Sequence, residues 1–156
     1  MKKKIICIGV VAVLLDIFTK AFINNSFNLM ETKTIINNFF SITKVYNTGA
    51  SWSILSGYRF VLVIIAILML ALLVYYQTKF ILNKRNIMAF GLLYGGIIGN
   101  LIDRIAYGYV IDFLDFNIFG YDFPVFNVAD ICIVLGIFLL IIAIYKKEDI
   151  DEVSSR

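Results

Sequence analysis

The sequence has no histidine, a single proline and only two cysteines in 156 residues. Without histidine the chain cannot form a Ser-His-Asp triad, a zinc site of the His-Glu-x-x-His type or a histidine general base. Cys7 and Cys132 each lie inside an apolar run outside any Cys-x-x-Cys motif, so we expect both to be buried free thiols. The sequence therefore predicts neither a metal site nor a bound cofactor.

Charge is also sparse, since 16% of the residues are charged and the net charge is +3. No basic patch interleaved with aromatic residues is present, which excludes nucleic acid as a partner. Apolar residues make up 61% of the chain and the mean hydropathy is +0.89, whereas a water-soluble domain is close to half apolar. This excess indicates a single domain embedded in membrane lipid.

Four apolar runs have lengths typical of membrane-spanning helices, at approximately residues 5–23, 60–76, 87–106 and 130–145. The first follows a basic N-terminus, as in a signal peptide, but no small-x-small cleavage site comes after it. A charged tail occupies residues 146–156.

The connection between the first two runs is polar. It contains two β-prone pieces, residues 34–36 and 39–46, joined by an Asn-Asn pair that favours a turn. We interpret them as a small antiparallel sheet outside the bilayer. The predicted fold class is an all-α membrane protein with four transmembrane helices, a small extracytoplasmic antiparallel β-sheet and polar outer loops.

A hexapeptide at residues 47–52 follows the predicted sheet. Asn47 and Gly49 indicate a close approach of the backbone to another group, and Trp52 suits the membrane interface. A simple turn explains this segment equally well.

Ionisable residues lie within the apolar runs, where each costs roughly 2.5–3.5 kcal/mol at a helix centre. Asp16 and Lys20 are four residues apart, so they share a helix face and can pair, either to fix helix packing or to support a polar site. Asn100, Asp103 and Arg104 share one side of the third run near its end. Such groups face a protein interior or a cavity.

A glycine stripe marks the same third run. Gly91, Gly95 and Gly99 recur every four residues, a spacing that lets a neighbouring helix approach closely in a membrane. We expect this helix to lie at the centre of the bundle's packing.

The distribution of basic residues predicts the orientation. Lysine and arginine gather at the N-terminus, in residues 78–86 and in the tail, whereas residues 107–128 contain three acids and no basic residue. The positive-inside rule therefore places both termini in the cytoplasm and the polar loops outside. The singled-out polar residues then converge at the outer membrane face.

Asp112 and Asp130 bound a stretch that contains Gly120 and the sole proline, Pro124, so it cannot continue as one helix. We expect a loop that starts and ends at one membrane face and brings the two carboxylates together. Two close carboxylates share one proton, which allows one to activate water while the other polarises a carbonyl. Asp130 is the better candidate for the ionised partner because a helix N-terminus favours negative charge.

The neighbouring polar residues fit this chemistry. Asn127 can cap the last helix or donate to a substrate carbonyl, and Asn100 and Arg104 can orient a carboxylate or the substrate. Two alternatives remain open on the residues alone: a small proton or ion transporter that uses intramembrane carboxylates, and a non-enzymatic packing protein.

Five segments carry a resemblance to a known family, and they are residues 16–20, 47–52, 99–104, 110–113 and 126–130. In this order they resemble the five sequence boxes of lipoprotein signal peptidase, also called signal peptidase II. The resemblance covers nearly the whole chain except the tail. One departure is visible, because the first box usually has glutamine after its aspartate and this chain has Ile17.

The resemblance implies an aspartic endopeptidase of the bacterial plasma membrane that cuts prolipoproteins just before a cysteine carrying diacylglycerol. It implies that Asp112 and Asp130 are the catalytic dyad. The positions that correspond to supporting or substrate-contacting residues are Asp16, Lys20, Asn47, Gly49, Asn100, Arg104 and Asn127. It further implies inhibition by globomycin, and we expect a monomer whose single peptidase domain covers residues 1–156.

Overall fold

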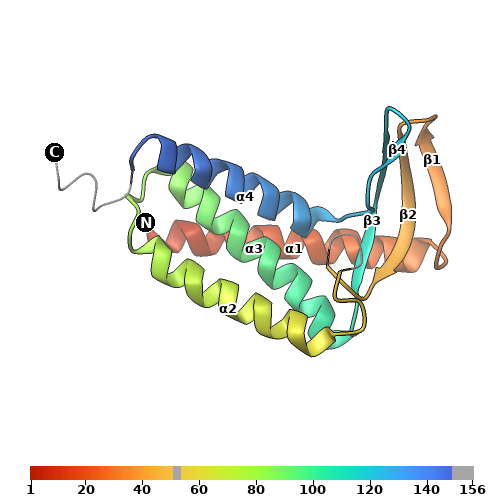
Figure 1. Cartoon of the computed structure of the whole chain (residues 1–156), viewed down its shortest axis with the longest axis horizontal. Helices are drawn as coiled ribbons and strands as arrows, with labels where there is room; N and C mark the ends of the chain where they lie inside the picture. The colour runs from red at the N-terminus through yellow and green to blue at the C-terminus, as the bar shows by residue number, and fades with distance from the viewer. Residues whose placement is uncertain (51–53, 149–156) are drawn as a thin grey trace.

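The computed structural model describes residues 1–50 and 54–148. The helices and strands in this part are α1 (Lys2–Ser26), β1 (Thr32–Ile36), β2 (Phe40–Asn47), α2 (Arg59–Gln77), α3 (Lys84–Ala106), β3 (Val110–Ile118), β4 (Tyr121–Asp122) and α4 (Val128–Tyr145). All four helices are long and apolar enough to cross a membrane, and the sheet lies at one end of the bundle (Figure 1). The predicted fold class, four spans with a small antiparallel sheet, is confirmed.

Helix α3 packs against each of the other three helices. Its glycines make this possible: a Cβ at Gly91 would lie 2.6 Å from the Ile8 side chain of α1, and a Cβ at Gly96 would lie 2.7 Å from Ile133 of α4. Gly91 and Gly95 of the stripe therefore allow the close approach of α1 that their spacing predicts, and Gly96, one position round the helix, allows the close approach of α4.

Helix α2 is mostly exposed and, within the described chain, buries only Leu62. In a membrane this surface faces lipid. Cys132 is buried on α4, but Cys7 is exposed on α1, so the prediction that both thiols are buried is wrong for Cys7. The reason is that an apolar residue of a membrane span can face lipid as readily as the protein interior.

The sheet is larger than the sequence predicts. Residues 110–118, which we expected to be a loop, form β3 and pair antiparallel with β2, giving the strand order β1-β2-β3-β4. The chain reverses at Phe119 and Gly120, both of which have positive φ. Gly120 and Pro124 rule out a continuous helix, as we argued, but they leave an extended strand fully possible.

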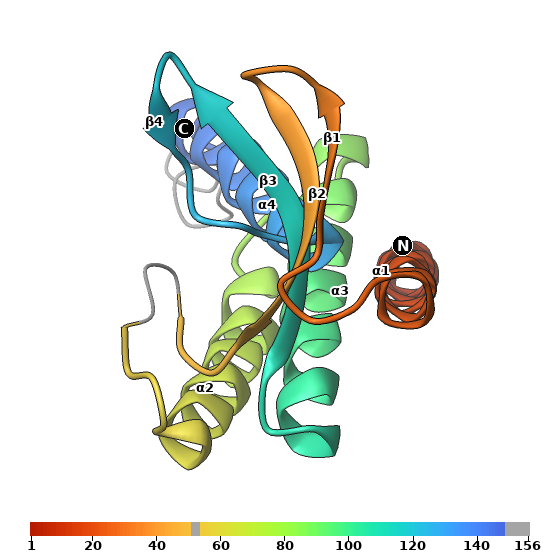
Figure 2. The same cartoon turned by 90° about the vertical axis from the view of Figure 1, so that its right-hand side faces the viewer.

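The sheet crosses the end of the bundle at which α1 and α3 finish and α4 begins. In Figure 2, α1 lies on one side of the sheet and α2 on the other. Ile23 of α1 packs with Ile111 and Phe113 of β3 in one buried cluster. Lys44 of β2 donates to the carbonyls of Asn24 (2.9 Å) and Phe27 (2.8 Å) at the end of α1, which satisfies carbonyls that a helix end leaves unpaired.

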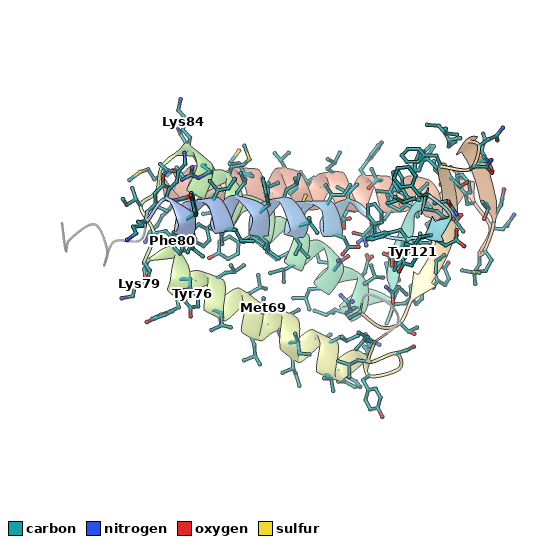
Figure 3. All side chains as sticks on the ribbon, turned by 45° about the horizontal axis from the view of Figure 1, so that its top comes forward. Met69, Tyr76, Lys79, Phe80, Lys84 and Tyr121 are labelled. Atoms are coloured by element: carbon teal, nitrogen blue, oxygen red, sulfur yellow. The ribbon has the colours of Figure 1, made fainter. Side chains whose placement is uncertain are left out.

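The other end of the bundle is held by a separate apolar cluster, formed by Ile5, Phe80, Ile87, Phe90 and Ala143. Lys79 and Lys84 lie at this end, opposite Tyr121 of the sheet (Figure 3). The fold thus separates a basic end from an end that carries the sheet.

Candidate active site

Asp112 lies in β3 and its carboxylate is almost completely buried, with 2% of the residue exposed. Two amide groups donate to it: Asn47 Nδ2 to Oδ2 at 2.9 Å and Asn127 Nδ2 to Oδ1 at 2.6 Å. Asn47 comes from the end of β2, which pairs with β3 at this point. The sheet therefore fixes Asp112 against the start of α4.

Asp130 occupies the first turn of α4, which begins two residues earlier than we predicted, at Val128. It forms a capping box with Asn127, because the Asp130 N–H donates to Asn127 Oδ1 at 3.0 Å and the Asn127 N–H donates to Asp130 Oδ2 at 3.2 Å. The second carboxylate oxygen accepts from Asn100 Nδ2 at 2.8 Å. Helix capping thus fixes the direction of this carboxylate.

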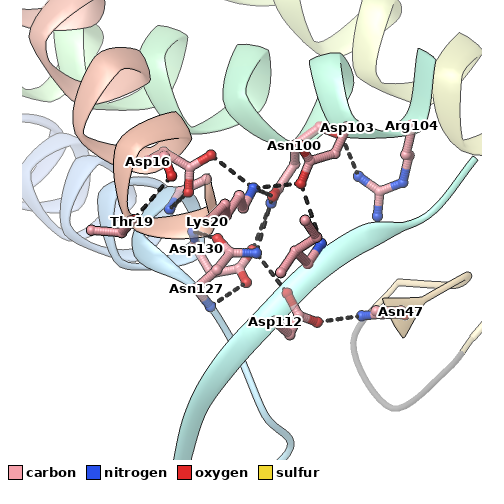
Figure 4. A network of polar contacts seen from close by, with 12 residues as sticks. Asp16, Thr19, Lys20, Asn47, Asn100, Asp103, Arg104, Asp112, Asn127 and Asp130 are labelled. Atoms are coloured by element: carbon pink, nitrogen blue, oxygen red, sulfur yellow. Dashed lines mark hydrogen bonds and ion pairs between the residues drawn. The ribbon is translucent and has the colours of Figure 1, made fainter. Parts of the chain in front are cut away.

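Asn127 contacts both aspartates and thereby joins them. Besides its bonds to Asp112 and Asp130, its Nδ2 donates to Asn100 Oδ1 at 3.1 Å (Figure 4). Asn127 is completely buried. Asn127 consequently links the carboxylates of β3 and α4, and the structure brings Asp112 and Asp130 to one site.

Lys20 stands behind these amides. Its ammonium lies 2.7 Å from Asp16 Oδ2 and 3.0 Å from Asp103 Oδ2, and it donates to Asn100 Oδ1 at 3.0 Å. Because Asn100 Oδ1 accepts from Lys20 and Asn127, its Nδ2 is left to donate to Asp130. The predicted Asp16–Lys20 pair is present and belongs to the polar site.

Asp16 and Asp103 each tie a neighbouring element to this network. Asp16 Oδ1 accepts from the Ala129 N–H at 2.9 Å, and a Cβ at Gly99 would lie 2.6 Å from Asp16 Oδ2. Asp103 Oδ2 accepts from the Ile111 N–H of β3 at 3.2 Å. We did not assign Asp103 to the site from the sequence, although it shares a helix face with Asn100.

Arg104 fixes the segment after β2. Its guanidinium donates to the Gly49 carbonyl at 2.9 Å, and the Gly49 N–H donates to Asn47 Oδ1 at 2.9 Å. The carbonyl of Asn100 is a weaker acceptor for the same guanidinium at 3.4 Å. The interpretation of Asn47 and Gly49 as a close-approach segment fits these contacts, whereas Trp52 lies outside the described residues.

A cavity of about 780 Å³ opens beside the aspartates. Its lining combines polar residues with apolar ones, namely Val45, Tyr46, Asn47, Thr48, Ala50, Asn100, Arg104, Val110, Asp112, Phe123, Pro124, Val125, Phe126, Asp130, Ile131, Ile133, Val134 and Leu135. Both carboxylates therefore line one cavity, which is large enough to hold a peptide segment.

The electrostatics of Asp112 suit a shared proton. Burial, followed by the neighbouring charge of Asp130, raises the pKa of Asp112 to about 7, although hydrogen bonds from Asn47 and Asn127 act in the opposite direction. Near neutral pH, Asp112 can therefore carry a proton. Among the described residues, no group of three or more Asp, Glu, Cys or His side chains is arranged to hold a metal ion.

Comparison with known proteins identifies the family of this chain. The family model for signal peptidase (SPase) II matches residues 8–146. The chain belongs to the signal peptidase II family. A lipoprotein signal peptidase of Staphylococcus haemolyticus is 38% identical over 97% of this chain and 100% of the relative. One from Staphylococcus aureus strain Newman is 44% identical over 90% of this chain and 87% of the relative.

Solved structures agree with this family. One bacterial membrane enzyme superposes with a TM-score of 0.82 at 42% identity, covering 91% of this chain and 87% of that chain. A second gives a TM-score of 0.77 at 41% identity, covering 90% of this chain and 91% of that one. This signal peptidase II is therefore a multi-pass bacterial membrane protein and an aspartic endopeptidase. The result selects the peptidase over the transporter and packing-protein alternatives.

Proposed function

We propose that Asp112 and Asp130 are the catalytic dyad and that the substrate is a prolipoprotein cut just before a cysteine that carries diacylglycerol. The observation that carries this proposal is Asn127, which hydrogen-bonds both carboxylates at the wall of one cavity. Asp115 and Asp122 do not line this cavity, so they are excluded from the dyad.

The two carboxylates take different roles. Asp130 removes a proton from water, and the hydroxide attacks the scissile carbonyl carbon while Asp112 gives its proton to the carbonyl oxygen. Asp130 then passes its proton to the amide nitrogen, the C–N bond breaks, and Asp112 regains a proton from the hydroxyl of the collapsing intermediate. The pKa of about 7 supports Asp112 as the proton carrier.

The remaining polar residues hold this pair in place. Asn47, Asn100 and Asn127 fix the carboxylate oxygens through the hydrogen bonds described above. Asp16 and Lys20 position Asn100 and the start of α4 from behind. Gly49 and Arg104 also support the site, because the hydrogen bond between them holds the segment after β2 at the mouth of the cavity.

The two walls of the cavity fit a lipidated peptide. On the α4 side, Ile131, Val134 and Leu135 line the cavity and are also exposed on the membrane-facing surface. On the sheet side, polar groups can meet the peptide backbone. Diacylglycerol can therefore remain in lipid while the scissile bond reaches the dyad.

The positive-inside rule favours both termini in the cytoplasm, with the sheet and the dyad at the outer face of the bacterial plasma membrane. The basic residues at the end of the bundle opposite the sheet support this orientation. We further propose that the enzyme acts as a monomer and that globomycin inhibits it.

The deciding experiment is cleavage of a diacylglyceryl prolipoprotein by purified enzyme in bilayers, beside the same substrate without lipid. Asp112→Asn and Asp130→Asn should each lower kcat by at least about 10³-fold, because each removes a proton-transfer group. Asp122→Asn is the matched control, since this exposed acid on β4 does not line the cavity.

Wild type should cut only the lipidated substrate, and globomycin should stop this cleavage. Near-normal turnover by either dyad variant would reject the dyad. Equal cleavage of both substrates would reject the lipid requirement, and an inserted wild type that cuts neither would reject the substrate class.

A further inference from the structure

The chain between β4 and α4 forms the edge of the sheet beside the cavity. Phe126 makes an isolated bridge with Leu114 of β3: its N–H donates to the Leu114 carbonyl at 3.1 Å and its carbonyl accepts from the Leu114 N–H at 2.8 Å. Both backbone groups of Phe126 are thus directed at β3. The backbone groups of the neighbouring residues determine whether the other side of this edge can form hydrogen bonds.

Val125 differs from Phe126 in its backbone contacts. The N–H groups of Phe123 and Phe126 donate to β3 at 2.9 and 3.1 Å, and the pairing is irregular between them, so that Val125 does not pair with β3. Within the described chain the N–H and carbonyl of Val125 make no hydrogen bond, and the preceding residue, Pro124, has no N–H to offer. Val125 also lines the cavity that contains Asp112 and Asp130.

The substrate needs hydrogen-bond partners for its backbone near the scissile bond. A signal segment that crosses lipid as a helix satisfies its own backbone, but the peptide bond to be cut must leave the helix to expose its carbonyl. In a dry environment each backbone group left unpaired is strongly unfavourable. An open strand edge within the cavity offers partners for these groups.

We propose that the substrate segment flanking the scissile bond binds as an added β-strand along residues 124–126, with the N–H and carbonyl of Val125 as its backbone partners. This inference rests on the proposed function and specifies how the same cavity holds the substrate. Strand addition of this kind recognises the main chain, while pockets for alternate side chains supply specificity. One enzyme can in this way accept many signal sequences.

The opposite edge of the sheet does not serve this purpose. Strand β1 is exposed along its length, but β2 and β3 separate it from the α4 side, and none of its residues lines the cavity. The edge at Val125 is continuous with the dyad, because Asn127 and Asp130 follow it directly in the chain.

The first test compares Val125→Pro with Val125→Ala. Proline removes the N–H and suits an extended edge, whereas alanine keeps the N–H and removes most of the side chain. With the lipidated substrate, we expect kcat/KM to be about tenfold lower for Val125→Pro than for Val125→Ala, through the loss of one hydrogen bond. Equal values for two folded variants would overturn the proposal.

The second test uses wild-type enzyme and does not depend on the folding of a variant. Synthetic lipopeptides carry one ester in place of an amide at successive positions on either side of the scissile bond. Val125 offers one carbonyl, so strand pairing predicts an about tenfold loss at a single position, where the ester removes the N–H that faces this carbonyl, and little change at the positions on either side. Equal losses at adjacent positions, or no loss at any, would overturn the strand while leaving the dyad and the lipid requirement intact.

Discussion

The two ends of α3 each carry a polar cluster, but the clusters are built differently. At the N-terminal end of α3, the partly buried Glu148 carboxylate accepts from Asn83 Nδ2 at 2.7 Å and Asn86 Nδ2 at 3.1 Å and pairs with Arg85. The Glu148 carbonyl also accepts from the Ile81 N–H at 3.0 Å. This cluster ties the chain after α4 to the connection before α3.

At the C-terminal end of α3, next to the sheet, two carboxylates line one cavity. The consequence appears in the pKa values, which move in opposite directions: the Arg85 hydrogen bond lowers the pKa of Glu148, whereas burial and the charge of Asp130 raise that of Asp112. A carboxylate surrounded by donors stabilises the fold. A carboxylate set beside another gains a proton that it can transfer.

Among the variants that test this comparison, Lys20→Met should have the largest effect on stability and turnover. It leaves Asp16 and Asp103 buried without their shared cation. Removal of one partner of a buried ion pair costs about 3–5 kcal/mol, and the Asn100 amide is then free to turn away from Asp130. We expect a much lower Tm and at least a hundredfold loss of kcat.

The control is Lys33→Met, which removes a lysine from the exposed strand β1. Thermal unfolding in detergent and cleavage of the lipidated substrate are measured for both variants. If Lys20→Met behaved like Lys33→Met, the network behind the dyad would have no positioning role.

A smaller effect should follow from the proton on Asp112. Its pKa rises from 3.8 in the unfolded chain to about 7, so folding favours the protonated form and stability is lost as the pH rises through about 7. Asp112→Asn cannot ionise. Its Tm relative to wild type should therefore be a few degrees higher at pH 8.5 than at pH 5.

The proton on Asp112 also predicts how the rate of cleavage depends on pH. Above about pH 7, wild-type kcat/KM should fall as Asp112 ionises and the dyad loses its acid. A Tm difference independent of pH, together with a flat rate profile up to pH 9, would contradict the raised pKa.

Many contacts of the helices and of the candidate site could be predicted from the sequence because helical spacing determines which residues share a face. The four-residue spacing of Asp16 and Lys20 predicts their contact, and Gly91 to Gly99 predicts the close helix packing. Asn127, three residues before Asp130, predicts the helix cap. These contacts are local, or they follow from one repeated interval.

Contacts that depend on strand register could not be predicted in this way. The loop expected between Asp112 and Asp130 rests on Gly120 and Pro124, which both lie outside β3, so the sequence predicts neither the pairing of β3 with β2 nor the contact of Asp103 with the Ile111 N–H. The partners of Lys44 at the end of α1 depend on the same register. Sequence spacing shows which face of a helix a residue occupies, but the residue that it contacts depends on how distant segments pair.

The smallest effect should come from Glu148→Gln, and it tests whether the two ends act independently. Glutamine keeps an oxygen that accepts from Asn83 and Asn86 but loses the charge that pairs with Arg85, so we expect a stability loss of about 1–2 kcal/mol at pH 7 and unchanged kcat. Because the folded pKa of Glu148 is lowered, its contribution is present at neutral pH and disappears as the pH falls through that lowered value. The Tm gap between wild type and variant should therefore close in acid, opposite to the trend for Asp112. A loss of kcat as large as that of Lys20→Met would mean that the Glu148 cluster also positions the dyad.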